Sequence, residues 1–297
     1  MRVHAIIIAL NEADFITETI KPLYAHCSGI SVLTQYDRDY YRHPVEPDLT
    51  VQKVLQIPDP VGKIHLVVRR YVDETASRNQ EMLALTADPL RGVSVHAWPL
   101  EEVRKLHGPP DYFLIVDADE IYDEATFPQI LEYLQAKRPV AMRVQAYEYG
   151  PSWHFRVAAR RYMFRQFGFV QAGRLFHSRR MLTPTEHRLN KLCGLLGLGD
   201  GVGSRLMRFD MCPVDVGVFH HAGYMRRDRS QILAKMKKHS HVGEYMNEDW
   251  IRNVLLQEYE HVSNESLPRN ILAGDWPESF FWDDLQMLVD HLMPNEG

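Results

Sequence analysis

Cysteine is scarce in this sequence, with 3 residues among 297. Cys27, Cys193 and Cys212 are odd in number, and no two of them have the CxxC spacing of a thiolate metal site. This pattern argues against a disulfide framework and against a structural zinc site. We therefore expect buried thiols in a reducing compartment.

Long apolar runs are also missing. The longest run near the start, residues 5–10, is far shorter than the roughly 20 residues needed to cross a bilayer, and Asn11 and Glu12 follow it directly. The start also lacks the charged segment and the small-residue cleavage site of a signal peptide. These absences predict a cytoplasmic protein with no integral membrane segment.

Positive charge is concentrated in one part of the chain, although the whole sequence has a net charge of -5. Residues 151–240 contain 17 Lys or Arg and 5 Asp or Glu, a net charge of +12, whereas the rest contains 17 and 34, a net charge of -17. A basic surface raises the local concentration of an anionic ligand. This segment predicts an anionic partner; the alternative is a solvated basic face.

Short apolar runs alternate with helix-like stretches in the first half of the chain. This alternation is typical of an α/β fold with a mostly parallel sheet flanked by helices. We expect strands at 3–9, 30–34, 64–68, 112–116 and 140–147, and helices at 73–87 and 124–137. We also expect a turn from Asn11 into a helix that ends near His26, and a proline-rich loop at 44–60. After Gly150 the sequence becomes aromatic and rich in arginine, with a further strand expected at 214–221. We therefore expect a soft boundary near residue 150.

A pair of acidic residues follows the fourth expected strand. Asp117-Ala118-Asp119-Glu120 comes directly after the apolar run 112–116. Ligands of open α/β sheets bind beyond the carboxyl ends of the strands. Two carboxylates spaced one residue apart at that edge can hold a hard divalent cation that bridges phosphates. Acidic residues at strand ends also serve as turn and cap residues, but the strand context favours a metal site at Asp117 and Asp119.

Three motifs, taken in order, resemble the family 2 glycosyltransferases. They are Ile6-Ile7-Ile8-Ala9-Leu10-Asn11-Glu12, Ser77-Arg78-Asn79 and Val116-Asp117-Ala118-Asp119-Glu120. Each motif is common singly, and their order and spacing carry the resemblance, which covers residues 3–147. The stretch 89–110 is a departure, because it is longer than expected between the second and third motifs.

The resemblance implies a GT-A (Rossmann-like) fold with two parts. Residues 1–150 would be the nucleotide-sugar-binding half, and residues 151–297 would be a basic acceptor-side half with C-terminal helices, the two forming one globular unit. In this family the turn after the first strand contacts the nucleotide, an acidic residue after the second strand contacts the base or ribose, and the Arg-Asn helix closes over the base. The implied donor-binding residues are Leu10, Asn11, Glu12, Asp37, Arg78, Asn79, Asp117, Ala118 and Asp119.

A second resemblance lies in the segment from Phe219 to Arg226, which reads FHHAGYMR and is followed by Lys235. It is similar to the segment that closes the domain in related bacterial transferases. There the histidine completes the metal site or touches the diphosphate, which places His221 with Asp117 and Asp119 as the metal ligands. Imidazole suits Mn²⁺, and cations such as Arg226 and Lys235 can neutralise a leaving diphosphate. A histidine on a strand can equally be a core residue.

The acceptor hydroxyl of an inverting transferase needs a base on the face opposite the leaving group. Thr185-Glu186-His187 follows Gly173-Arg174-Leu175-Phe176, which resembles the strand that precedes an acceptor-side acidic residue in the family. We predict Glu186 as the base, with His187 next and Asp215 or Glu148 behind them. A charged surface turn is the alternative, and a retaining enzyme would need no such base.

These features together predict a metal-dependent glycosyltransferase. It would move a hexose or pentose from a UDP-sugar, in preference to a GDP-sugar, with Mn²⁺ or Mg²⁺ and with inversion. The basic segment favours an anionic acceptor, either a glycan or hydroxymethylated DNA. A nucleotidyltransferase is one alternative, but the turn at 10–14 lacks the glycines of its phosphate loop. The other is an inactive GT-A-fold module that binds glycan or nucleic acid.

Overall fold

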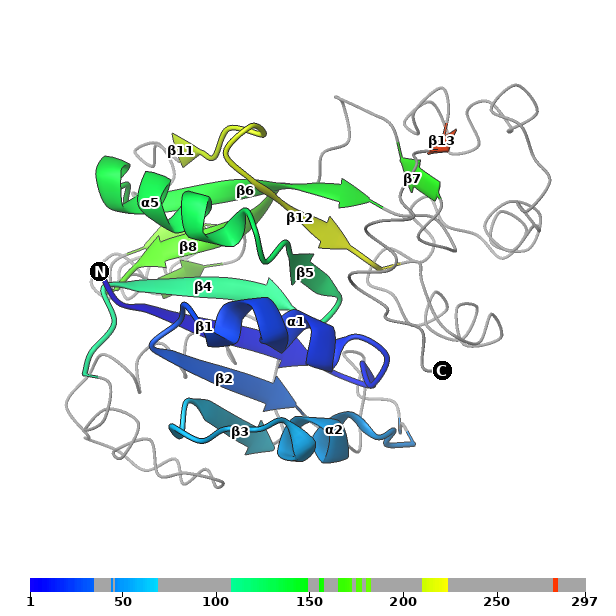
Figure 1. Ribbon diagram of the computed structural model, residues 1–297. Coiled ribbons are helices and arrows are strands. Elements are labelled where there is room, and N and C mark those ends of the chain that lie inside the picture. The colour runs from blue at the N-terminus through cyan, green and yellow to red at the C-terminus, as the bar shows by residue number, and fades with distance from the viewer. Residues whose placement is uncertain are drawn as a thin grey trace, which may run out of the picture.

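The computed structural model describes the parts of the chain that build the main sheet, the helices that cover it and two short strand pairs (Figure 1). The described residues are 1–34, 44, 46–68, 108–148, 155–157, 165–172, 175–177, 180–182, 210–223 and 280–282.

Nine strands of these residues form one sheet in the order β3-β2-β1-β4-β8-β6-β12-β5, with β11 beside β6. Their bounds are β1 Val3–Ala9, β2 Gly29–Thr34, β3 Ile64–Val68, β4 Tyr112–Asp117, β5 Glu120–Tyr122, β6 Ala141–Glu148, β8 Arg165–Gln171, β11 Asp210–Met211 and β12 Val218–His221. Two short pairs lie outside the sheet: β9 (Leu175–His177) with β10 (Arg180–Leu182), and β7 (Phe155–Val157) with β13 (Phe280–Trp282).

Strands β1 to β4 are mutually parallel, so their carboxyl ends lie at one edge of the sheet. Strand β8 is antiparallel to both β4 and β6, and β12 is parallel to β6 and antiparallel to β5. Strand β5 follows β4 after two residues in the sequence. In the sheet, however, it pairs with β12 and lies at the end of the strand order, with β8, β6 and β12 between it and β4. The sheet therefore curls, and β12 is brought beside the carboxyl end of β4.

Three helices cover one face of the sheet in Figure 1: α1 (Ile16–Tyr24), α2 (Thr50–Gln56) and α5 (Phe127–Lys137). Alternate side chains of β1, including Ile7, point to this face because successive strand residues point to opposite sides. They form one core cluster with Ile16 and Ile20 of α1 and Ile130 of α5, all of them fully buried. Burial of each such side chain contributes about 1.5–3 kcal/mol.

The opposite face of the sheet is buried as well. Ile6, Leu33 and Phe113 are at most 1% exposed, and His4 shares a buried 2.9 Å hydrogen bond with Ser31. Parallel sheets are normally covered on both faces, which explains why the first strands read as nearly continuous apolar runs.

The predicted fold class is confirmed: the structure is mixed α/β, with a curled, mostly parallel sheet and flanking helices. The strands expected at 3–9 and 64–68 have the same bounds, and those at 30–34, 112–116 and 140–147 agree within one residue. The loop expected at 44–60 is wrong in part, because α2 lies within it. Two prolines flank this seven-residue helix, which buries only Thr50 and Val54 and so carries a weak helical pattern.

Several other expectations have partial outcomes. The strand expected at 214–221 begins only at Val218, and the helix expected at 73–87 lies outside the described residues. Strands β8, β11 and β12 come from beyond residue 150 and complete the same sheet, so a boundary there stays a prediction. Cys27 and Cys212 are free and buried, as expected, whereas Cys193 is not among the described residues.

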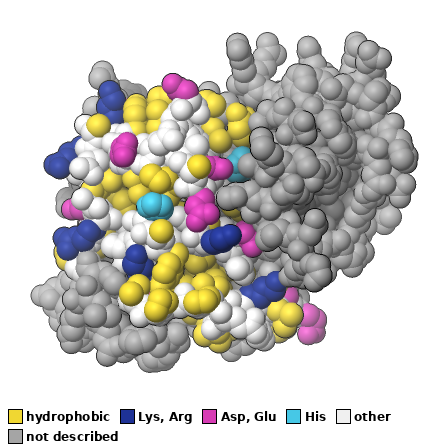
Figure 2. All heavy atoms as spheres, in the orientation of Figure 1, with side chains coloured by type: hydrophobic (Ala, Val, Ile, Leu, Met, Phe, Trp, Pro, Cys, Tyr) yellow, Lys and Arg dark blue, Asp and Glu magenta, His cyan; other side chains and the backbone are white. Residues whose placement is uncertain are grey.

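The visible surface of the described part carries charges of both signs. In Figure 2, Lys and Arg side chains lie among Asp and Glu side chains on this face. Most of the basic segment 151–240 is outside the described residues. No helix of the described part is long and apolar enough to span a membrane.

Candidate functional site

The acidic turn joins β4 to β5 and is held from two neighbouring elements. The Ala118 amide donates to the Ile8 carbonyl of β1 at 3.0 Å. The hydroxyl of Thr19, fully buried on α1, donates to the Ala118 carbonyl at 2.6 Å. These bonds fix the backbone between the two predicted metal ligands, Asp117 and Asp119.

Glu120 closes the turn from inside. Its Oε2 accepts a 2.9 Å hydrogen bond from the Asp117 amide, and its side chain is 1% exposed. Oε1 of the same carboxyl is buried without a hydrogen-bond partner among the described residues. Burial raises the pKa of Glu120 well above its usual range; nearby Asp117 raises it further, and His221 opposes the shift. Glu120 is therefore a turn-closing carboxyl that is costly to ionise.

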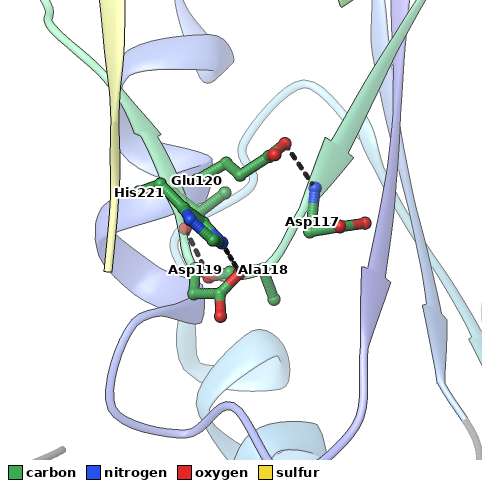
Figure 3. A network of polar contacts seen from close by, with 6 residues as sticks. Asp117, Ala118, Asp119, Glu120 and His221 are labelled. Atoms are coloured by element: carbon green, nitrogen blue, oxygen red, sulfur yellow. Dashed lines mark hydrogen bonds and ion pairs between the residues drawn. The ribbon is translucent and has the colours of Figure 1, made fainter. Parts of the chain in front are cut away.

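Strand β12 brings His221 to this turn. His221 lies opposite Glu120 in the antiparallel pair with β5, and the Ala222 amide donates to the Asp119 carbonyl at 2.8 Å. The His221 Nε2 and Asp119 Oδ1 atoms are 3.7 Å apart, and Figure 3 shows the two side chains pointing toward one another. Two residues about a hundred positions apart in the sequence thus form one polar pair.

Gly223 provides the space for the imidazole. A Cβ atom at this position would lie 2.7 Å from Cε1 and 2.9 Å from Nε2 of His221. The glycine two residues after the histidine therefore belongs to the site, although neither charge nor hydrogen-bonding capacity marks it in the sequence.

The donor set of this pair fits a divalent cation. A carboxylate oxygen and an imidazole nitrogen are ligands that Mn²⁺ accepts. Their 3.7 Å separation is shorter than about 4.2 Å, twice a metal–ligand distance of about 2.1 Å. Asp117 is directed to a different side of the turn in Figure 3, and no group of three such side chains lies close enough to hold a metal within the described ranges. The structure brings two of the three predicted ligands together.

The turn after β1 occupies the same edge of the sheet. Leu10 and Asn11 are half-buried, and Glu12 is 9% exposed. The Glu12 carbonyl accepts hydrogen bonds from the amides of Phe15 and Ile16, which leads the chain into α1. Since β1 and β4 are parallel neighbours, this turn lies next to the acidic turn. The predicted nucleotide residues of this turn, Leu10, Asn11 and Glu12, are therefore adjacent to the turn that carries Asp117 and Asp119.

The remaining predicted residues are distributed differently. Asp215 is exposed and precedes the amino end of β12, whereas His221 is at its carboxyl end. The backbone of Glu148 pairs with that of His221. The residues outside the described part are Asp37, Arg78, Asn79, Glu186, His187, Arg226 and Lys235.

Sequence reasoning assigned no role to four residues that shape this edge of the sheet: Thr19, Asp48, Thr50 and Gly223. In the sequence Thr19 is an ordinary helix residue. Its full burial and its hydrogen bond to the acidic turn are visible only in the structure. Asp48 and Thr50 have the spacing of a helix start, which was a usable signal for α2 but not for their contacts with the turn after β1.

Comparison with known proteins gives matches among solved structures alone. No protein-family model matches the sequence, and no curated protein matches it either. A crystal structure of S. aureus TarS 1-349 in complex with UDP-GlcNAc has a TM-score of 0.39 and 11% identity, over 80% of this chain and 65% of that chain. This chain thus spans 65% of the length of that structure.

A second similar structure is glucosyl-3-phosphoglycerate synthase from Mycobacterium tuberculosis, in complex with Mn²⁺, UDP and phosphoglyceric acid. It has a TM-score of 0.34 and 12% identity, over 79% of this chain and 74% of that chain. Both proteins are GT-A-fold glycosyltransferases. At these values the likeness is a general one, and the function proposed below depends on this chain's own residues.

Proposed function

We propose that this protein is a GT-A glycosyltransferase that moves a sugar from a nucleotide diphosphate donor to a hydroxyl acceptor, with inversion. The observation that carries the proposal is the meeting of Asp119 and His221, 3.7 Å apart, at the carboxyl ends of parallel strands. Ligands of open α/β sheets bind at this edge. The turn after β1, which the family resemblance assigns to the nucleotide, lies beside it.

The residues of the proposed site have different roles toward the metal and the donor. Asp119 and His221 would hold Mn²⁺ or Mg²⁺, which supplies positive charge against the leaving diphosphate. We propose that Asp117, which points to another side of the turn, contacts the donor beside that charge. Thr19 and Glu120 keep the backbone of the turn fixed, so that the carboxylates need little rearrangement when the donor binds.

The reaction itself is a displacement at the anomeric carbon. The oxygen of the acceptor hydroxyl forms a bond to this carbon while the bond from the carbon to the diphosphate oxygen breaks. The nucleoside diphosphate leaves with the electron pair of that bond. The base that takes the hydroxyl proton is proposed to be Glu186, with His187 as the next candidate. Arg226 and Lys235 are proposed to neutralise the diphosphate as it leaves.

The proposed donor and acceptor classes rest on features of the sequence. We propose a UDP-sugar before a GDP-sugar because the chain resembles family 2 glycosyltransferases, and an anionic acceptor because residues 151–240 carry a net charge of +12. A glycan that carries anionic groups and hydroxymethylated DNA both have this chemistry. An acceptor that binds through its charge should lose affinity as ionic strength rises.

Thermal unfolding with nucleotides tests the proposal first. A UDP-sugar at about 100 times its dissociation constant should raise the unfolding free energy by roughly 2.7 kcal/mol, and only with Mn²⁺ or Mg²⁺ present. Prolonged incubation should also release UDP by slow hydrolysis, measured by chromatography. Stabilisation without release points to an inactive binding module, and pyrophosphate release from a nucleoside triphosphate points to a nucleotidyltransferase. Either result contradicts the proposal.

Asp119→Ala is the matching variant. It should abolish the metal-dependent stabilisation and the UDP release, because it removes the carboxylate that faces His221. Asp111→Ala is its control, since Asp111 precedes the same strand and bonds the Arg2 amide at the opposite edge of the sheet. If both variants behave alike, the acidic turn has no special role.

A further inference from the structure

The turn after β1 has a backbone conformation that depends on Asn11. This residue has φ 55°, in the left-handed region that asparagine tolerates better than most residues. The turn redirects the chain from the carboxyl end of β1 into α1. Such a conformation persists where surrounding contacts determine it.

The side chain of Asn11 makes those contacts with the segment before α2. Its Nδ2 donates to the Glu46 carbonyl at 2.9 Å, and its Oδ1 accepts from the Asp48 amide at 3.3 Å. Both ends of the amide are therefore engaged by backbone groups of the protein. This arrangement suits a structural bond more than a contact with a ligand.

The segment returns hydrogen bonds to the turn. Asp48 Oδ2 accepts from the Ala13 amide at 2.9 Å, and Thr50 Oγ1 accepts from the Glu12 amide at 2.8 Å. Asp48 Oδ1 also accepts from the amide and the hydroxyl of Thr50. Four hydrogen bonds thus join residues 11–13 to residues 46–50, and two more brace Asp48 against Thr50.

We infer that Asn11, Asp48 and Thr50 are positioning residues for the donor nucleotide. They lock the turn after β1, which the family resemblance assigns to the nucleotide. In this assignment Asn11 serves the donor through the backbone that it fixes, not through its own amide. The inference rests on the proposed function, because the positioned ligand is the nucleotide of the proposed donor.

A positioning role has a specific kinetic signature. Loss of Asp48 should raise the KM for the UDP-sugar and the dissociation constant of UDP by about tenfold, because small displacements of binding groups weaken binding strongly. The kcat at saturating donor should change little, since Asp119 and His221 are held by other elements.

The experiment compares Asp48→Ala with Asp59→Ala. Each aspartate accepts three hydrogen bonds; those of Asp59 come from Tyr24 and from the amides of Lys63 and Ile64, at the amino end of β3. Both variants should lose stability in urea unfolding, but only Asp48→Ala should bind UDP more weakly by calorimetry. Equal UDP affinity in the two variants would overturn the inference.

Thr50 supplies a second test that survives if Asp48→Ala does not fold. Thr50→Ser keeps the hydroxyl that accepts from the Glu12 amide and should restore wild-type KM, whereas Thr50→Val removes it and should not. If both variants have wild-type KM, the positioning role is wrong. If the wild-type protein binds no nucleotide, the proposed function itself is wrong. If nucleotide binding is unchanged by substitution of Asp48 and Thr50, only the positioning role is wrong.

Discussion

At the scale of single residues, the space around His221 decides whether the pair with Asp119 can form. The imidazole leaves no room for a Cβ atom at Gly223, because that atom would lie within 3 Å of two imidazole atoms. The ring is the end of a side chain and can rotate away. The site thus depends on a missing side chain as much as on the two that are present.

Gly223→Ala should weaken metal binding while leaving the fold largely intact. The displaced imidazole would no longer face Asp119, and changes of this kind around metal ligands typically cost 10- to 100-fold in affinity. The measurement is the Mn²⁺ concentration that gives half-maximal stabilisation by UDP. Gly217→Ala is a suitable control, because its Cβ would meet Ile130 in the core. It should lower the melting temperature and leave the Mn²⁺ requirement unchanged.

At the scale of elements, helix α1 is coupled to the acidic turn through one side chain. Thr19 is fully buried, and its hydroxyl donates to the Ala118 carbonyl. The helix therefore does more than cover the sheet. Through this hydrogen bond it also fixes the position of the turn between β4 and β5 relative to the helix.

Thr19→Val should destabilise the protein by about 1–3 kcal/mol, because it leaves the buried Ala118 carbonyl without its donor. Thr19→Ser keeps the hydroxyl and should retain most of the stability. Urea unfolding without nucleotide measures both variants. We also expect the valine variant to need more Mn²⁺ for UDP binding; a variant with lost stability but an unchanged Mn²⁺ requirement would limit Thr19 to a role in folding.

The elements also show what the sequence could predict. The buried runs 3–9 and 64–68 were predictable because parallel strands covered on both faces are continuously apolar. Helix α2 was missed because prolines flank it and only two of its residues are buried. The pairing of β5 with β12 depends on contacts between residues about a hundred positions apart, which local patterns do not encode.

The site was predictable to a similar degree. Asp119 and His221 came from motifs of known chemistry, and the structure places them together. The contacts of Thr19, Asp48 and Thr50 were not predictable, because each depends on a backbone group of another element. A sequence motif marks residues that do chemistry more readily than residues that hold those residues in place.

At the scale of the whole molecule, the buried Glu120 links stability to pH. In the unfolded chain a glutamate titrates near its usual pKa of about 4.3. In the folded protein its pKa is well above that value, because of burial and then the nearby Asp117. The stabilising contribution of the neutral carboxyl is thus complete below the unfolded pKa and is lost as pH rises toward the folded pKa.

Glu120→Gln should therefore gain stability relative to wild type as pH rises from about 5 to 8, because the wild-type protein loses the contribution of its neutral carboxyl in this direction. The glutamine carbonyl can still accept from the Asp117 amide. Urea unfolding at several pH values, in EDTA to remove metal, measures the difference. Glu132→Gln, at an exposed position of α5, is the control. A difference that is constant across this range would contradict the prediction.

The pairing of β5 with β12 also affects the order in which the protein is completed during synthesis. The ribosome releases β1 to β4 and the acidic turn early, so these parallel strands can begin to associate while the rest is still being translated. His221 emerges about a hundred residues after Asp119. The nascent chain therefore carries the acidic turn without its histidine while about a hundred further residues are translated. The pair of Asp119 and His221 is then among the last parts of the described sheet to form.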